Sequence, residues 1–518
     1  VRYVAISIAH GTRTNDGQLI ASLPGLLEPF APLSALIEAV WQNSIAVCES
    51  MLELKYLQAR ARWKRVLERL PSEGTGELYY VIYVRRAIAY GMGLLEARLG
   101  LPSASEWASE LDGDILQEVS AMYLRKLVCL QQGDLEGAEA FRKQAELLQV
   151  RAVSDQMFTS SLILELVAHA MARDVQGVKA LRDRIAPLAE RHAGWLPTAT
   201  LAGALFLRLV GELEPALAEF EHCLRLDDLA RDFGRQAIIA WPAASAGYVE
   251  TLVDLERAEE ATAYGQRLLG ECQARGIDVA AHPLERSLAL AEAKSGLGSQ
   301  AALGGRVTQA LERLERLIEA QSALGIKGLH LAASYEARAR IAAWMHDRLA
   351  FTRYAQLSAA EYAKGQGSAL SARYAALMVD AAPQGDVSVG STEFASTVHL
   401  RSPDPRSGML ERELLAASSQ KERCARALSL LCELYAAPGG ELYLQGEAGL
   451  SLAASLGEHA FAPGSGARAQ AYFERELNAD GMTTQAFGDD EAEAALADPG
   501  ADDERMSLLT GGRDAAEL

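Results

Sequence analysis

The residues that could carry out chemistry are few, and their spacing does not fit the common catalytic and metal sites. The 518 residues include nine histidines and six cysteines, which are scattered along the chain. The sequence has no Cys-x-x-Cys, His-Glu-x-x-His or Gly-x-Ser-x-Gly pattern, the arrangements that build redox pairs, zinc sites and serine nucleophiles. His222-Cys223 stands alone and is expected to pack within a helix. We therefore predict no catalytic residue, no metal ligand and no cofactor-binding residue in this chain.

Short patterns that suggest nucleotide or kinase chemistry are incomplete. No Gly-x-x-x-x-Gly-Lys-[Ser/Thr] phosphate loop occurs, and Gly91-Met92-Gly93 is followed by Glu96 where a glycine loop needs its third glycine. His346-Asp347-Arg348 has the residues of a kinase catalytic loop in the wrong order. Neighbouring carboxylates such as Glu259-Glu260 point about 100° apart on a helix and do not converge on one substrate. Any kinase or ATPase domain is expected upstream of Val1, where the chain starts inside an ongoing segment.

Composition and charge indicate a folded protein that does not bind polyanions. The chain has 50 Lys+Arg against 69 Asp+Glu, a net charge of −19, which disfavours nucleic acid and anionic membranes as partners. No run approaches the roughly 18 apolar residues of a membrane span, and sparse cysteines fit a reducing compartment. We expect a cytoplasmic protein. Aromatic residues are only 6% while Ala, Leu, Glu and Arg abound, which favours helix over sheet.

The elements that would position any site are predicted to be repeated helix pairs. Apolar residues recur at spacings of three and four on both sides of Gly133-Asp134, which indicates two helices joined by a turn. Turns of this kind recur along the chain, and a small or apolar marker residue lies five positions after each one. Successive markers are 38 to 49 residues apart, except for one double step of 79 residues. The missing unit of the double step is expected near Arg98. These markers are residues 59, 138, 178, 216, 261, 310 and 351.

A period of this length is typical of a helical array, in which each pair of antiparallel helices buries its apolar face on the next pair. The pattern resembles the tetratricopeptide (TPR) repeat in a degenerate, long-helix form, as in large bacterial signalling ATPases and kinases. We predict a mainly α fold, a TPR-like α-solenoid of about eight helix hairpins over residues 35–380. The residues expected to pack the repeats are Gly133, Ala138, Ala145, Gly211, Ala216, Ala261, Gly305 and Ala310. Arg338 is the candidate for a side chain in the concave groove.

The chain changes character after Met378. Residues 381–408 are rich in Pro, Gly, Ser and Thr and are predicted to be a linker, while residues 489–518 begin as an acidic stretch and are predicted to be a disordered tail. Residues 1–34 are treated as an N-terminal segment, truncated at its start. Between linker and tail, a helix from Met409 is followed by two short strands within 440–455. This order resembles the start of a GAF-type sensory domain, so residues 409–488 are predicted to be a small α+β, partial GAF-like region.

The resemblance implies a non-catalytic regulatory and protein-interaction segment of a bacterial multidomain signalling protein, with a Ser/Thr kinase or nucleotide-binding module upstream. Two alternatives stay open: a free-standing TPR adaptor, and a small-molecule sensor that uses the GAF-like pocket or the solenoid groove. We expect a protein or peptide partner with basic segments in the groove, because the chain is acidic. Neighbouring domains in cis are further expected partners. The helix from Met409, whose stripe includes Leu410, Leu414, Leu428 and Leu431, is expected to pair across a homodimer or to dock on the last repeat.

Overall fold

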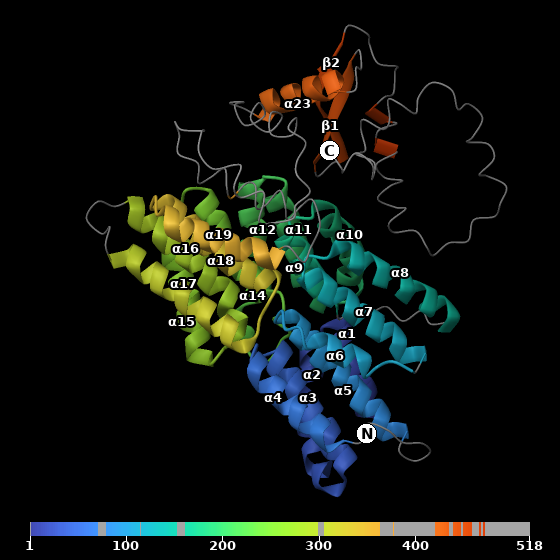
Figure 1. The fold of residues 1–518 in the computed structure, drawn as a ribbon. Coiled ribbons are helices and arrows are strands. Elements are labelled where there is room, and N and C mark those ends of the chain that lie inside the picture. The colour runs from blue at the N-terminus through green and yellow to red at the C-terminus, as the bar shows by residue number, and fades with distance from the viewer. Residues whose placement is uncertain are drawn as a thin grey trace, which may run out of the picture. The chain divides into compact units, whose positions relative to one another are not determined.

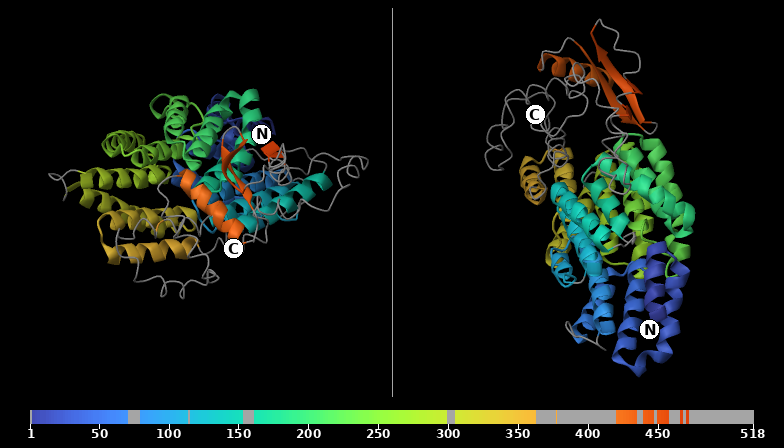
Figure 2. Two further views of the ribbon diagram at one scale, coloured as in Figure 1. Left: turned by 90° about the horizontal axis from the view of Figure 1, so that it is seen from above. Right: turned by 90° about the vertical axis from the view of Figure 1, so that its right-hand side faces the viewer.

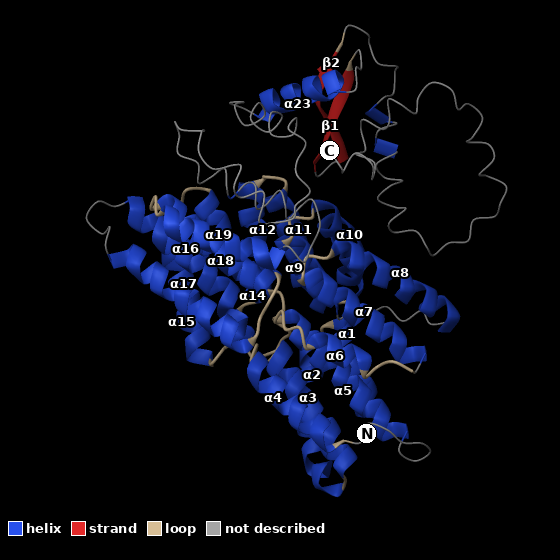
Figure 3. Ribbon diagram, in the orientation of Figure 1, coloured by secondary structure: helices blue, strands red, loops and turns tan. Residues whose placement is uncertain are grey.

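The protein is described from a computed structural model, which divides the chain into two compact units, Val1–Gln384 and Gly385–Leu518. The described residues are 2–70, 79–113, 115–152, 161–298, 305–362, 377, 420–434, 439–446, 449–457, 466–467 and 470–471. The predicted linker (381–408) and acidic tail (489–518) lie outside these residues. In the described part of the chain, strands occur only in one hairpin of the second unit (Figure 3).

The first unit consists of consecutive antiparallel helix pairs, in the order shown in Figure 1. Among its described residues, eight pairs lie between Ala35 and Tyr362, and one more precedes them. The prediction of a mainly α, TPR-like repeat fold is therefore confirmed. The pairs are α1 (Arg2–Thr14) with α2 (Gly17–Leu27), α3 (Ala35–Met51) with α4 (Tyr56–Arg69), α5 (Tyr79–Arg98) with α6 (Ala104–Ser109), α7 (Ile115–Gln131) with α8 (Leu135–Ala152), α9 (Leu162–Met171) with α10 (Val175–Arg191), α11 (Leu196–Leu209) with α12 (Leu213–Leu226), α14 (Trp241–Asp254) with α15 (Ala258–Arg275), α16 (His282–Gly298) with α17 (Gly305–Leu324), and α18 (Leu329–Trp344) with α19 (Arg348–Tyr362). Short helical turns η1 (Glu28–Leu33), η4 (Ala193–Trp195), α13 (Leu229–Asp232) and η5 (Val279–Ala281) connect some pairs.

Seven of the described pairs share one kind of turn. A residue with positive φ ends the first helix, and the fifth residue after it is buried on the second helix. Glycine has the positive φ in only two of these turns, at Gly133 and Gly211. In the other five turns, the residue with positive φ carries a side chain: Asn15, Leu54, Arg173, Glu256 and His346. The buried residues are Ile20, Ala59, Ala138, Val178, Ala216, Ala261 and Phe351. The unit expected near Arg98 differs, because its turn is at Gly100 and its second helix, α6, is only six residues long.

Of the residues expected to pack the repeats, the five alanines and Gly133 are buried, whereas Gly211 and Gly305 are exposed. Ala145, Ala216, Ala261 and Ala310 are fully buried, and Ala138 is 3% exposed. Gly305 differs from Gly133 and Gly211 because it is the first residue of α17 and has no positive φ. Small side chains at these positions let two helices approach closely, and larger neighbours such as Phe220 fill the space beside them.

The first pairs do not simply continue the stack; they pack on the connections between later pairs. The backbone N–H groups of Gly234 and Ile238 donate to the carbonyls of Leu52 and Met51, and that of Lys327 donates to the carbonyl of Gly100. In Figure 1 and in the right-hand view of Figure 2, the blue N-terminal helices lie at one end of the green and yellow helices. The first unit is therefore closed on itself by contacts between residues about 180 to 230 positions apart.

Close backbone approach at this contact requires glycine at two positions. A Cβ on Gly17 would lie 2.5 Å from the backbone of Gln236 and Ala237. A Cβ on Gly328 would lie 2.2 Å from the carbonyl oxygen of Gln131, and Gly328 also has a φ of +65°. Any other residue at these two positions would push the N-terminal pairs away from the later ones.

The N-terminus of α4 is capped from the far end of the chain. Its preceding residue, Lys55, makes no side-chain cap, so the first backbone N–H groups of the helix need another acceptor. The carboxylate of Asp278, between α15 and α16, accepts from the N–H groups of Tyr56 at 3.1 Å and Leu57 at 2.8 Å. Asp278 thus stabilises a helix and fixes the position of a pair 220 residues away at the same time.

The second unit is described for one helix and one hairpin. α23 (Gln420–Leu434) packs on strands β1 (Gly440–Gly446) and β2 (Gly449–Leu456), which pair antiparallel with Gly446 opposite Gly449. Leu428 is 5% exposed and packs beside Gly440. The pairing is irregular between Leu442 and Tyr443, and Leu452 is 54% exposed. Leu410 and Leu414 lie outside the described residues.

No helix in the described residues is long and apolar enough to cross a membrane.

Overpacking one repeat should measurably destabilise the first unit. Ala216 is fully buried on α12, so Ala216→Leu should lower the free energy of unfolding by about 1–3 kcal/mol. Urea denaturation followed by circular dichroism measures this loss. Ala218→Leu, at an exposed position of the same helix, is the matched control and should change stability by less than about 0.5 kcal/mol. Equal effects of the two variants would show that the pairs do not pack as described.

The distant cap should be detectable in the same way. Asp278→Ala removes both acceptors at the start of α4 and should cost about 1–2 kcal/mol. Asp278→Asn keeps one acceptor oxygen in the same place and should cost less than Asp278→Ala. Hydrogen exchange of the Tyr56 and Leu57 amides should accelerate in Asp278→Ala; unchanged exchange at both amides would contradict the capping role.

Candidate functional site

The first helices of five consecutive pairs surround a cavity of about 650 Å³. The residues that line it recur at spacings of three and four along each helix, so each helix presents one face to the cavity. The helices are α9, α11, α14, α16 and α18. The opposite wall comes from the N-terminal pairs and includes Tyr56, Arg98 and Gln131. The closure of the first unit thus converts the concave face, which we expected to be an open groove, into a partly enclosed chamber.

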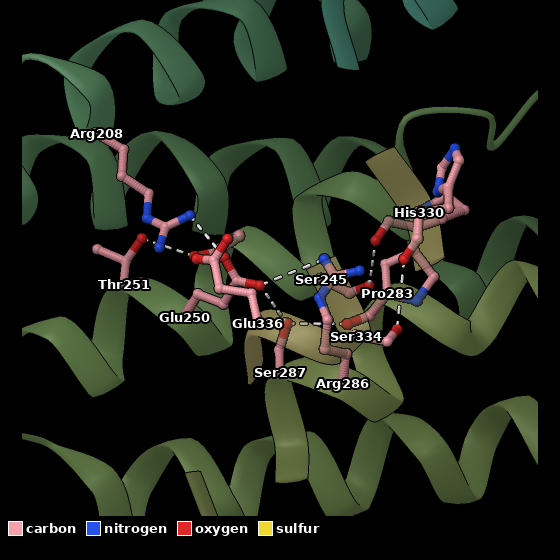
Figure 4. Close-up of polar contacts among 12 residues, drawn as sticks. Arg208, Ser245, Glu250, Thr251, Pro283, Arg286, Ser287, His330, Ser334 and Glu336 are labelled. Atoms are coloured by element: carbon pink, nitrogen blue, oxygen red, sulfur yellow. Dashed lines mark hydrogen bonds and ion pairs between the residues drawn. The ribbon is translucent and has the colours of Figure 1, made fainter. Parts of the chain in front are cut away.

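An ion-pair cluster crosses the inner face between three of these helices (Figure 4). Arg208 on α11 donates to Glu250 at 2.7 Å and to Asp254 at 2.8 Å, both on α14. Ser287 on α16 donates to the second oxygen of Glu250 at 2.9 Å, and Arg286 lies 3.5 Å from that oxygen. Burial alone would raise the pKa of Glu250, but Arg208 and Arg286 outweigh it and hold that pKa at about 2. Glu250 is therefore a permanent anion at any physiological pH.

Two histidines of the cavity are held neutral. Burial lowers the pKa of His282 to about 4, and the positive charge of Arg286 acts in the same direction. His330 has its pKa lowered to about 4 by burial, by Arg286 and by His282. Neutral imidazole has one ring nitrogen that accepts and one that donates a hydrogen bond, so both rings are available for polar recognition without adding charge.

Several buried polar atoms that line the cavity have no hydrogen-bond partner. They are the side-chain oxygens of Gln131 and Gln321, Nε2 of His330 and Nε of Arg208. Buried polar atoms are rarely left unpaired in folded proteins, because each one costs free energy comparable to a lost hydrogen bond. All four atoms are closed to solvent, so they mark places where the wall itself is imperfectly hydrogen-bonded.

Part of the remaining wall is apolar. Aliphatic side chains of α9 and α11, such as Ile163, Val167 and Leu205, face the chamber. In the described residues, no cluster of three His, Cys, Asp or Glu side chains could hold a metal ion. An apolar chamber with a few fixed polar groups is suited to binding and orienting a ligand.

Arg338, the groove residue suggested by the sequence, does not line this cavity. Its guanidinium donates to Glu315 at 2.8 Å and lies over the ring of Tyr354. It borders a separate, shallower depression between α17 and α18. Arg340 lines the chamber instead, because two residues on a helix point about 200° apart.

Sequence reasoning missed the chamber because it followed the markers on the second helix of each pair. One first helix carried a usable signal, namely a single ionisable residue, Arg208, in the otherwise apolar α11. That signal does not reveal which residue Arg208 meets, since the pairing of Arg208 with Glu250 spans 42 residues.

Comparisons with known proteins assign the chain to no family. No protein-family model matches the chain, and a search of curated proteins finds no match. Among solved structures, the chain is similar to a Rap protein complexed with competence and sporulation factor, with a TM-score of 0.44, 14% identity, and coverage of 66% of this chain and 90% of that one. It is also similar to the APC/C hetero-tetramer Cut9–Hcn1, with a TM-score of 0.37, 13% identity, and coverage of 77% and 73%. By its own stack of antiparallel pairs, the chain is a TPR-like helical-repeat protein.

The neutral histidines should make stability fall as the solution is acidified. Their pKa of about 4 in the fold lies below the ordinary 6.5, so between these values the unfolded chain binds protons that the folded chain does not. The free energy of unfolding should therefore decrease from pH 6.5 towards pH 4, by up to about 3 kcal/mol per histidine.

Urea titrations between about pH 7.5 and 5 measure this slope. Burial raises the pKa of some carboxyls, Asp227 above all, so the histidine contribution is taken as the difference between parent and variants over the same range. His330→Gln should flatten it, and the double variant with His282→Gln should flatten it further. His192→Gln, at an exposed position at the end of α10, is the control and should leave the slope unchanged. A slope that persists in the double variant would contradict the neutral, buried state of the two rings.

Proposed function

We propose that this chain is an interaction protein without a catalytic step, and that it binds a peptide segment of a partner protein in the chamber of the first unit. The observation that carries the proposal is a partly enclosed cavity whose wall combines aliphatic side chains with charged and neutral polar ones. A peptide supplies what this wall needs, because its main chain has N–H and C=O groups at regular intervals and its side chains cover apolar surface. A volume of about 650 Å³ is in the range of ordinary ligand sites.

On the sequence resemblance we propose further that this chain is a cytoplasmic regulatory segment of a bacterial signalling protein. A Ser/Thr kinase or nucleotide-binding module would act in cis, and α23 with its hairpin would belong to a partial GAF-like region. The free-standing TPR adaptor is the alternative, and the sequence upstream of Val1 distinguishes the two. A homodimer through the second unit is a separate prediction, tested by sedimentation of the full chain against a version that ends at Asp380.

A small-molecule sensor is the second candidate, and the enclosure of the chamber favours it. An open groove would suit an extended chain, whereas a roofed cavity can surround a compact ligand on most sides. Native mass spectrometry of the protein purified from its producing cells tests this candidate. A bound species of a few hundred daltons that is lost when the chamber is filled would support a sensor.

Filling the chamber should abolish peptide binding. Ala243 on α14 lines the cavity and is partly exposed, so Ala243→Trp places an indole in the space without displacing a fully buried side chain. Peptides selected from a random phage-displayed library on the full chain should bind Ala243→Trp about tenfold or more weakly than the parent, as measured by calorimetry.

Ala218→Trp, on the exposed side of α12, is the matched control and should bind the selected peptides like the parent. The proposal fails if the selected peptides bind Ala243→Trp as tightly as the parent, since their site would then lie elsewhere.

A further inference from the structure

The charge balance inside the chamber is opposite to that of the chain. The protein has a net charge of −19, yet five arginines and only three carboxylates line the cavity, and its two histidines are neutral. Overall charge therefore does not describe what the cavity attracts at short range. The expectation of a basic partner, which rested on the net charge alone, does not take this local balance into account.

The three carboxylates are already engaged. Glu250 and Asp254 share Arg208, which donates to both at hydrogen-bond distance. Glu336 accepts a hydrogen bond from the hydroxyl of Tyr362 at 2.7 Å. Two of the three carboxylates are therefore already paired with an arginine of the chain.

The arginines, by contrast, have capacity to spare. Arg286 reaches Glu250 only at 3.5 Å, and Arg340 reaches Asp254 only at 3.9 Å. Arg98 donates to the hydroxyl of Tyr56 at 2.7 Å, and within the described residues no carboxylate lies within ion-pair distance of it. A guanidinium has five N–H donors, so each of these side chains can still bind a carboxylate in a two-pronged arrangement.

We propose that the chamber selects acidic peptides, with Asp or Glu side chains of the ligand paired to Arg286 and Arg98. This inference rests on the proposed peptide-binding function and adds the chemistry of the ligand to it. Because the site is partly enclosed, an arginine–carboxylate pair formed there is stronger than the same pair at the open surface. Binding occurs against the net charge of the protein, so the selectivity arises within the chamber.

Competition between two synthetic peptide pools tests the proposal. Both pools contain peptides of about ten residues with the same apolar positions, and the charged positions carry Asp and Glu in one pool and Lys and Arg in the other. The full chain is incubated with an equimolar mixture, and retained peptides are identified by mass spectrometry. The parent protein should retain acidic peptides over basic ones by about tenfold or more.

Arg286→Gln should reduce this enrichment by about fivefold or more, and Arg98→Gln is a second variant with the same expectation. Glu250 keeps Arg208 and Ser287 when Arg286 is replaced, so the variant is expected to fold, which its circular dichroism spectrum verifies. Arg306→Gln is the matched control. Arg306 pairs with Glu259 at a partly exposed position outside the cavity, and its replacement should leave the enrichment intact.

Enrichment of the basic pool, or enrichment of the acidic pool that survives both Arg286→Gln and Arg98→Gln, overturns the inference. Ala243→Trp separates this outcome from a failure of the peptide-binding function itself. If the parent retains peptides without acidic preference and Ala243→Trp does not retain them, the peptide-binding function stands and only the acidic selectivity is wrong. If Ala243→Trp still retains the peptides, or if the parent retains neither pool, both the peptide-binding function and the acidic selectivity are wrong.

Discussion

The contact between the N-terminal helix pairs and the connections of the later pairs is the constraint on which the rest of the first unit depends. It consists of backbone hydrogen bonds and of Asp278, whose carboxylate caps a helix more than 200 residues away. A stack of helix pairs without such a contact presents an open concave surface. Here the contact places Tyr56, Arg98 and Gln131 opposite α9 to α18, and the concave surface becomes the wall of a chamber.

Enclosure also determines the electrostatics of the site. Charges that would be weakly coupled at an open surface interact strongly once water is excluded, because the local dielectric falls. Arg208 and Arg286 therefore hold Glu250 ionised, with a pKa of about 2, while the same environment keeps His282 and His330 neutral. The result is a chamber with fixed carboxylates, neutral rings and arginines that are only partly engaged. Its local charge is independent of the acidic exterior.

The turns within the pairs show why the repeat is hard to recognise. The backbone conformation is kept at seven turns, but glycine occupies the positive-φ position in only two of them. Asn15, Leu54, Arg173, Glu256 and His346 adopt the same conformation at a cost of about 1–2 kcal/mol each. The packing of neighbouring pairs offsets that cost, so the geometry survives without a constant residue. Such a sequence keeps the period of the repeat while it loses the residue signature, which agrees with the absence of a matching family model.

The sequence by itself determined the local structure: the helix pairs, their period, the turns at Gly133 and Gly211, and the small buried residues five positions later. These follow from hydrophobic spacing and turn chemistry, which act over a few residues. Only the tertiary structure decided that the groove is closed, that Arg340 and not Arg338 faces it, and that Arg208, Glu250 and Arg286 meet. Each of these depends on the curvature summed over several pairs and on contacts between distant residues. A one-residue change in helix phase rotates a side chain by about 100°, so local patterns cannot fix which side chains converge.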